Sequence, residues 1–199
     1  MSEYYLSLSS TLDISFPWKL VWRSKVPTKV AFFSWTASLG KILTTENLWY
    51  KGVAVVDWCY MYKKSGESVN HLLHCPIAYE LWSMVWALFG LQWVMPHGVS
   101  DLFLSWQGSF GGYRSIDLWR AVPYCVLWCI WRERSSRCFE GKERSISEFK
   151  SLLLHTLLEW SSSFNLFPCS NFLEMLDLCN FCIWCTVFHV HPQCTWSFD

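Results

Sequence analysis

The sequence lacks an excess of charge of either sign and has few charged residues of any kind. Lys and Arg together number 16, Asp and Glu together also number 16, and the formal net charge is zero. A neutral chain has no bulk field that points to nucleic acid or to an anionic membrane as its partner. Because 15 Trp and 14 Phe accompany this low charge, the composition favours poor solubility or an apolar partner.

Long apolar runs are also missing. The longest charge-free windows, 81–100 and 178–198, are broken by Gly, Pro, His, Gln or Asn and fall short of the roughly 20 apolar residues that cross a bilayer. The N-terminal segment has neither the basic region nor the apolar stretch of a signal peptide. The ten cysteines are therefore expected to be reduced thiols. The sequence predicts an intracellular protein, nuclear or cytoplasmic, with no membrane partner.

The residue patterns of several enzyme classes are absent as well. A polymerase holds two metal ions with paired carboxylates, whereas the aspartates here are scattered singly and no glycine-rich phosphate loop occurs. A cysteine hydrolase that paired Cys75 with His71 or His74 would need a positioned base and a third, orienting group. Adjacency in the sequence shows neither, so we expect the chain not to be an enzyme.

The sequence does contain a series of helical patterns, which predict a mainly α fold. Helices are expected over 27–40, 45–52, 75–90, 115–141 and 145–160. Thr45 is a candidate N-cap of the second, and Pro123 either kinks the fourth or marks its true start. Ser145 and Glu148 have the spacing of a capping box. The polar end of the fourth helix (Arg132, Glu133, Arg134 and Arg137) is expected to be a solvated face.

Side-chain periodicity and composition divide the chain into five segments. In 75–90 an apolar face is predicted for Ile77, Leu81, Met84, Val85 and Leu88, and in 145–160 for Phe149, Leu153, Leu157 and Trp160. Gly and Pro residues in 93–114 are typical of a linker. The predicted segments are a loose N-terminus (1–15), a small domain (16–92), the linker (93–114), a helical segment (115–162) and a tail rich in Cys and aromatic residues (163–199).

The stretch "CYMYKKSGESVNHLLHCP" at 59–76 has most of the features of a zinc site. Cys59 and Cys75 offer thiolates and His71 an imidazole, and a polar turn lies between them. Tyr62 occupies the position where a second cysteine is expected, and a tyrosine phenol is a poor zinc ligand at neutral pH. His74 or water would then complete the shell. The alternative is that the two cysteines are small buried apolar residues.

Two further clusters suggest binding chemistry. Lys19, Arg23, Lys25 and Lys29 alternate with tryptophans, and Lys63 and Lys64 lie in the polar turn. Cations beside aromatic rings are typical of RNA or DNA binding, although the same pattern fits core tryptophans with solvated lysines. In the tail, metal binding and simple packing are both open for a second group of thiols and imidazoles (Cys179, Cys182, Cys185, His189, His191 and Cys194).

Parts of the sequence resemble the reverse transcriptase zinc-binding domain of plant LINE-type (non-LTR) retrotransposons. The family run W-x4-P-x-K-V-x-x-F-x-W is matched from Trp22 to Trp35, and a T-x-x-x-L segment follows at Thr44. The cluster "ESVNHLLHCP" and the later "LWCIWRERSSRCFEG" extend the resemblance, which covers about 16–164; in the later stretch Ser135 replaces the usual asparagine.

The resemblance implies that Cys59, His71 and Cys75 are zinc ligands, that Tyr62 replaces the fourth ligand, and that 16–92 is the zinc-binding-like domain. It further implies a non-catalytic fragment of a retrotransposon-derived reverse transcriptase. Its structural zinc module would help a polymerase encoded elsewhere to hold RNA or DNA. The alternative is a degenerate or protein-interaction module that binds neither metal nor nucleic acid.

Overall fold

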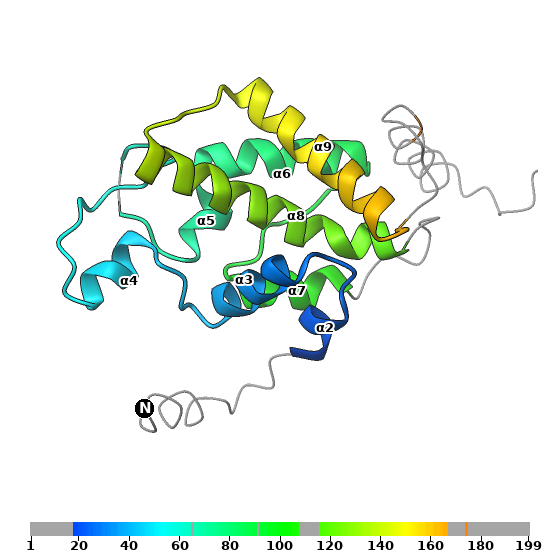
Figure 1. Cartoon of the computed structure of the whole chain (residues 1–199), viewed down its shortest axis with the longest axis horizontal. Helices are drawn as coiled ribbons and strands as arrows, with labels where there is room; N and C mark the ends of the chain where they lie inside the picture. The colour runs from blue at the N-terminus through cyan, green and yellow to red at the C-terminus, as the bar shows by residue number, and fades with distance from the viewer. Residues whose placement is uncertain (1–17, 65, 91, 108–115, 167–173, 175–199) are drawn as a thin grey trace, which may run out of the picture.

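Helices make up most of the structure, a computed structural model that describes residues 18–64, 66–90, 92–107, 116–166 and 174 (Figure 1). No strand occurs in these ranges, which confirms the predicted mainly α fold. In chain order the helices are α2 (Trp18–Arg23), α3 (Thr28–Ser38), α4 (Thr45–Tyr50), α5 (His71–His74), α6 (Pro76–Leu88), α7 (Val99–Gln107), α8 (Ile116–Ser135), the π-helical turn η1 (Ser136–Glu140) and α9 (Ile146–Ser163).

Helix α8 is the central element of the fold. It contacts α3, α5, α6, α7 and α9, and Figure 1 shows it between α6 and α9 on one side and α3 and α7 on the other. Val122, Val126, Leu127 and Ile130 on this helix are at most 1% exposed. The predicted small domain (16–92) and the predicted helical segment (115–162) therefore share one hydrophobic core.

Pro123 lies inside α8, so it does not mark the start of this helix. Proline has no backbone N–H, and the carbonyl four residues earlier, that of Trp119, loses its intrahelical partner. The indole Nε1 of Trp106 donates to this carbonyl at 3.0 Å, and Trp119 Nε1 donates in return to the Trp106 carbonyl at 3.3 Å. The two indole rings stack with centroids 4.2 Å apart. The Trp106 side chain on α7 thus gives the Trp119 carbonyl the hydrogen bond that Pro123 cannot donate.

Local sequence signals explain the starts of three helices, α4, α6 and α9. Ser145 and Glu148 form the predicted capping box at α9, and Pro76 occupies the first turn of α6. The prediction of Thr45 as N-cap of α4 is wrong by one residue, because the Thr44 side chain accepts the hydrogen bond from the Asn47 N–H. The Thr45 hydroxyl is buried and donates instead to the Glu67 carbonyl at 3.1 Å.

The apolar faces agree with the predictions in α9 and are shifted in α6. Phe149, Leu153, Leu157 and Trp160 are all buried. In α6 the buried residues are Ala78, Leu81, Trp82, Val85 and Trp86, whereas Ile77, Met84 and Leu88 are only partly buried. The buried face is thus centred on Trp82 and Trp86. Trp82 packs against Trp106 of α7, with ring centroids 6.0 Å apart.

The prediction of a linker over 93–114 is wrong for Val99–Gln107, which forms α7. Leu102, Phe103 and Trp106 on this helix are at most 1% exposed, so it is part of the core. Pro96 and Gly98 precede this short helix in the sequence, and three glycines follow it. Their presence suggests a linker, although the residues between them have helical periodicity.

Some sequence predictions lie outside the described residues. They include the loose segment 1–15 and the tail cluster of Cys179, Cys182, Cys185, His189, His191 and Cys194. Within the described part of the chain, no helix combines the length and the apolar character that a membrane crossing requires.

Candidate metal centre

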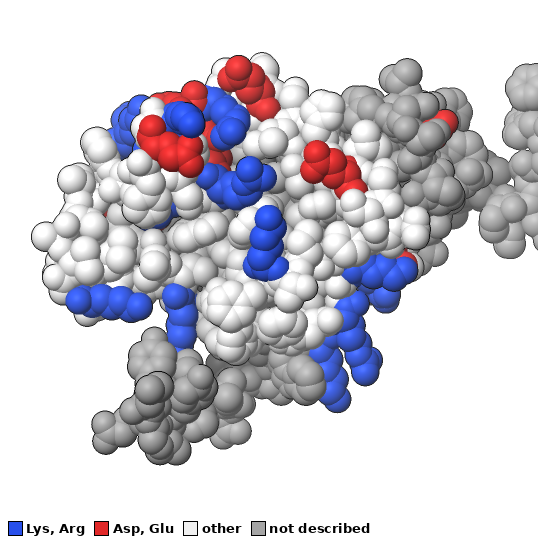
Figure 2. All heavy atoms as spheres, viewed as in Figure 1, with Lys and Arg blue, Asp and Glu red and all other residues white. Residues whose placement is uncertain are grey.

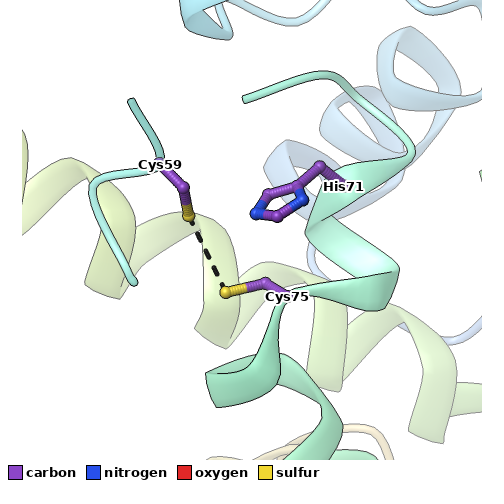
Figure 3. Close-up of side chains that lie close together, drawn as sticks. All are labelled: Cys59, His71 and Cys75. Atoms are coloured by element: carbon purple, nitrogen blue, oxygen red, sulfur yellow. Dashed lines mark hydrogen bonds between the residues drawn. The ribbon is translucent and has the colours of Figure 1, made fainter. Parts of the chain in front are cut away.

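Cys59, His71 and Cys75 converge on one point in the structure (Figure 3). Cys59 begins a tight turn, His71 is the first residue of α5, and Cys75 joins α5 to α6. The two sulfur atoms are 3.7 Å apart, and the candidate ligand atoms of all three residues lie within 4.8 Å of one another. A search of the described residues for three or more His, Cys, Asp or Glu side chains that could hold one metal ion finds this group.

The turn that follows Cys59 reverses the chain toward α5. The Lys63 N–H donates to the Cys59 carbonyl at 2.6 Å, and the Cys59 N–H donates to the Lys64 carbonyl at 3.4 Å. Lys63 has φ of 58°, a left-handed conformation that few non-glycine residues adopt. The Tyr62 N–H points at the Cys59 sulfur and favours its thiolate. This backbone arrangement forms although Tyr62 replaces the expected cysteine.

Cys75 lies where a negative charge is stabilised by the backbone. It immediately precedes Pro76, the first residue of α6. The hydrogen bond with Cys59 lowers the pKa of Cys75 to about 7, and the N–H groups of Ile77 and Ala78 at the helix N-terminus act in the same direction. The same hydrogen bond, together with burial, raises the pKa of Cys59 to about 12. Cys75 is therefore the more readily ionised of the two thiols.

His71 contributes a buried nitrogen that lacks a partner. Figure 3 shows one ring nitrogen of His71 turned toward the two sulfurs, and its Nε2 makes no hydrogen bond within the described structure. The nearby Cys59 thiol raises the pKa of His71, against the effect of burial. A buried polar atom without a partner is costly, and a metal ion at this point would satisfy it.

These three groups fit zinc. Two thiolates on one tetrahedral zinc, at Zn–S distances of about 2.3 Å, lie about 3.8 Å apart, which agrees with the 3.7 Å between Cys59 and Cys75. Both cysteines are at most 1% exposed, and backbone N–H groups already point at their sulfurs. Cys59 Sγ, Cys75 Sγ and His71 Nε2 are the atoms that would hold the ion.

His74, the candidate for a fourth protein ligand, lies outside the group of three, as does Tyr62, which occupies the position of the expected cysteine. Tyr62 is 39% exposed, and the Lys64 ammonium lies 5.3 Å from the centroid of its ring. His74 is exposed, and its Nε2 lies 3.2 Å from the His97 carbonyl oxygen. Neither belongs to the group of three, so the structure offers three protein ligands.

A buried ion pair fixes the segment between the ligands. The Arg134 guanidinium on α8 contacts both carboxylate oxygens of Glu67 at 2.8 to 3.2 Å. Both side chains are at most 1% exposed, and the guanidinium carbon of Arg134 lies 5.1 Å from the ring centroids of Tyr60 and of Trp131. The Glu67 backbone in turn bonds to Thr45. This ion pair ties the metal-binding segment to α8.

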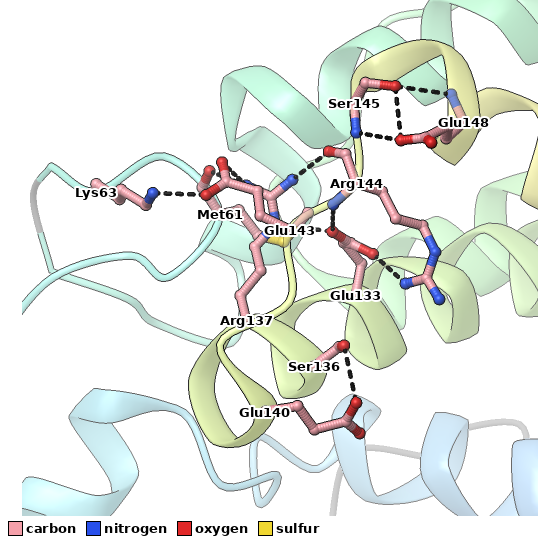
Figure 4. Close-up of polar contacts among 10 residues, drawn as sticks. All are labelled: Met61, Lys63, Glu133, Ser136, Arg137, Glu140, Glu143, Arg144, Ser145 and Glu148. Carbon is pink, nitrogen blue, oxygen red and sulfur yellow. Dashed lines mark hydrogen bonds and ion pairs between the residues drawn. The ribbon is translucent and has the colours of Figure 1, made fainter.

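A second network holds the turn itself (Figure 4). Arg137 in η1 donates to the Met61 carbonyl at 3.0 Å and to Glu133 at 2.9 Å. Lys63 pairs with Glu143 at 2.6 Å, and Arg144 pairs with Glu133 at 2.6 Å. The η1 turn and the loop between η1 and α9 thus hold the residues that follow Cys59.

The prediction of a solvated face at the end of α8 is therefore wrong for most of its residues. The side chains of Glu133, Arg134 and Arg137 are at most 6% exposed, whereas Arg132 is exposed. Glu133, Arg134 and Arg137 support the metal centre, a role that the sequence did not predict. Arg134 and Glu67 are 67 positions apart, and no local pattern links them.

The six predicted nucleic-acid contacts fall into two separate groups. In the first, Lys19 and Arg23 lie exposed on α2, Lys25 pairs with Asp117 at 2.7 Å, and the Lys29 ammonium is 5.6 Å from the Trp128 ring centroid. Figure 2 shows basic side chains gathered at the α2 end of the molecule. Lys63 and Lys64 lie in the Cys59 turn, near the end of α8 opposite to the Lys25–Asp117 pair, and α8 is about 30 Å long.

Comparison with known proteins agrees with this geometry. Residues 1–82 match the family described as zinc-binding in reverse transcriptase. The match includes Cys59, His71 and Cys75 and ends within α6, before α7, α8 and α9. No curated protein and no solved structure matches the chain. The first part of the chain is thus similar to a zinc-binding region associated with reverse transcriptases.

Proposed function

We propose that the chain is a non-catalytic accessory region of a retrotransposon-derived reverse transcriptase of the plant LINE type, and that it binds one structural zinc ion. The observation that carries the proposal is the convergence of Cys59, His71 and Cys75, with sulfurs 3.7 Å apart and a buried His71 nitrogen that lacks a partner. The family match over residues 1–82 supports the reverse transcriptase origin.

A structural role follows from the position of the three ligands. When bound, zinc supplies a positive charge that keeps both thiols ionised and joins the Cys59 turn to α5 and α6. A catalytic site would also need a free general base beside the metal. Glu67 is the buried carboxylate close enough to affect the pKa values of His71 and Cys75. Because Glu67 is paired with Arg134, it is not available as a general base.

The partner that we propose is RNA or DNA held for a polymerase encoded elsewhere. Lys19, Arg23, Lys25 and Lys29 cluster on α2, α3 and the turn between them, beside Trp22, which is 46% exposed. Cations near an accessible aromatic ring suit the backbone and the bases of a single strand. Such binding would weaken steeply with salt.

One observation favours a second candidate function. Trp49 and Tyr50 on α4 are 68% and 71% exposed, and Val56 nearby is 60% exposed. Exposed apolar side chains of this size are typical of a protein interface. A protein-interaction module without metal would self-associate or bind a partner independently of salt, and it would show no affinity for nucleic acid.

The metal content of the purified full-length chain tests the first proposal. We expect up to one zinc per chain in the wild type and a large loss in Cys59→Ser, while Cys138→Ser serves as control because its half-buried thiol lies outside the group of three. Equal zinc in wild type and Cys59→Ser would contradict the proposal. Binding of a labelled single strand at several salt concentrations, on the same samples, separates the two candidate functions.

A further inference from the structure

A cavity of about 210 Å³ lies at the opposite end of the molecule from the metal centre, between the end of α2, α7 and the first turns of α8. Arg23 at the end of α2 and the following Ser24 line it on one side, and Arg120 and Tyr124 line it from α8. Asp117, one turn before Arg120 on α8, pairs with Lys25, whereas Arg137 beyond the far end of α8 contacts the Cys59 turn. The cavity thus lies along the first half of α8, and the metal centre lies near the other end of this helix.

Two cations at the cavity are available for a ligand. Arg23 and Arg120 are both exposed, and no ion pair is found for either among the described residues. The nearby carboxylate of Asp117 is engaged by Lys25 at 2.7 Å. The cavity therefore carries an excess of positive charge that the described protein does not neutralise.

Tyr124, which also lines the cavity, has a buried hydroxyl. Tyr124 is 3% exposed, and its hydroxyl makes no hydrogen bond of ordinary geometry with the described residues, although Ser24 lies close enough to limit the rise in its pKa. Ser24 directs its own proton to the Val21 carbonyl at 2.5 Å. Burial raises the pKa of Tyr124 to about 12, so the phenol remains a neutral donor.

The size and the walls of the cavity select a small anion. Its volume is below the range of about 300–1,000 Å³ that is typical of drug-sized ligands. The rings of Phe103 and Trp106 are each 1% exposed, and they already stack on Tyr124 and Trp119 with centroids 4.5 and 4.2 Å apart. No open ring face remains on these two residues for a base to stack on. Two guanidinium groups and one hydroxyl donor suit the oxygens of a phosphate.

We propose that this cavity binds a phosphate group through Arg23, Arg120 and the Tyr124 hydroxyl. The phosphate belongs either to the backbone of a nucleic acid strand or to a free nucleotide. The choice of a nucleic acid strand as the source rests on the proposed function, whereas binding of phosphate itself does not. Lys19 lies on the same basic surface and would contact a neighbouring phosphate of a strand.

The test uses the full-length chain and four variants: Arg23→Gln, Arg120→Gln, Tyr124→Phe and Arg132→Gln. Arg132 is the matched control, because it is an exposed arginine on the same helix, about 18 Å from Arg120 by helix length. Binding is measured with a fluorescent single-stranded DNA and RNA by anisotropy, and with inorganic phosphate and a nucleoside monophosphate by calorimetry. Zinc content and thermal midpoint are recorded for every variant.

We expect Arg23→Gln and Arg120→Gln each to weaken binding of the strand about tenfold and to reduce its salt slope by about one, while Arg132→Gln binds as wild type. Tyr124→Phe should weaken binding severalfold without lowering the thermal midpoint. A purely structural hydroxyl would give the reverse pattern, with lower thermal stability and unchanged affinity, and would remove Tyr124 from the proposed site.

The remaining outcomes decide the source of the phosphate and the proposal itself. Saturable binding of inorganic phosphate or nucleotide without binding of a strand would support the cavity and exclude nucleic acid. Variants of Arg23 and Arg120 that behave like Arg132→Gln, or the absence of saturable binding of any probe, would overturn it. A chain without zinc that still binds phosphate in the expected manner would contradict the proposed metal centre alone.

Discussion

At the scale of single residues, Tyr62 is what distinguishes this metal centre from a site with four protein ligands. The backbone around it already has the shape that a ligand turn needs, because the Tyr62 N–H points at the Cys59 sulfur and Lys63 takes a left-handed conformation. The tyrosine ring instead lies partly exposed beside Lys64. The turn thus retains its geometry without its second thiol.

Replacement of Tyr62 by cysteine is therefore expected to tighten zinc binding. A third thiolate on a preformed turn adds a strong ligand at little conformational cost, so we expect an affinity gain of at least about tenfold in a chelator competition. Tyr62→Phe is the control and should bind zinc as the wild type does. An unchanged affinity for Tyr62→Cys would show that position 62 cannot reach the ion.

The buried pair of Glu67 and Arg134 is expected to be the most sensitive ionic contact in the described structure. Glu67→Gln leaves the Arg134 guanidinium buried without its counter-ion, which typically costs about 3–5 kcal/mol in the free energy of unfolding. Glu80→Gln breaks the exposed pair with Lys150 and should cost at most about 1 kcal/mol. Urea unfolding of both variants measures the difference, and similar losses would contradict the role given to Glu67.

At the scale of secondary-structure elements, the metal-binding segment and α8 form one unit. Arg134 and the following η1 turn hold both sides of the segment, through Glu67 and through the Met61 carbonyl. Leu81, Trp82 and Val85 of α6 are fully buried in a core to which α8 contributes. The ligands in residues 1–82 thus depend on helices outside the matched region.

A fragment of residues 1–92 is accordingly expected to fail as an independent zinc domain. Without α8 and α9, Glu67 loses its partner and α6 loses part of its core. We expect such a fragment to lack cooperative thermal unfolding and to bind zinc much more weakly than the full chain, as followed by circular dichroism and chelator competition. Cooperative unfolding with full zinc affinity in the fragment would contradict this dependence.

The elements differ in how far the sequence predicts them. Long periodic segments with caps were predictable, as Ser145 with Glu148 and the buried face of α9 show. The short α7 was not, because flanking glycines and a proline dominate its neighbourhood. The burial of Glu133 and Arg134 was not predictable either. A charged helix end is normally exposed to solvent, and the partner that buries Arg134, Glu67, lies 67 positions away in the sequence.

The candidate metal centre was largely predictable for a physical reason. A thiol pair with a nearby imidazole around a polar turn has few packing alternatives, and the structure brings Cys59, His71 and Cys75 together as expected. The sequence left the fourth ligand open, and the structure places His74 outside the group, beside the His97 carbonyl. The orientation of an exposed helix-end histidine depends on a distant loop, which no local spacing reveals.

At the scale of the whole molecule, the charge network near the metal centre gives stability a dependence on pH. Burial alone would raise the pKa of Glu133, but hydrogen bonds from Arg144 and Arg137 hold it below its usual value. A carboxylate with a lowered pKa stabilises the fold above the unfolded-state pKa, and this contribution is lost as the pH falls through the folded-state pKa.

Stability is therefore expected to fall as the pH drops below about 4.5, the ordinary value for glutamate. Urea unfolding of the full chain between about pH 7 and pH 3 measures this loss. Glu133→Gln should start from a lower stability and lose less of it on acidification, while Glu80→Gln serves as the exposed control and should follow the wild type. A slope for Glu133→Gln equal to that of the wild type would exclude Glu133 as a source of the acid sensitivity.

X-ray absorption spectroscopy at the zinc edge of the metal-loaded full chain tests the central claim most directly. The structure predicts two sulfur neighbours, from Cys59 and Cys75, at about 2.3 Å and one imidazole nitrogen, from His71, at about 2.0–2.1 Å. Light atoms would occupy any further position. A spectrum without sulfur in the first shell would contradict the metal centre.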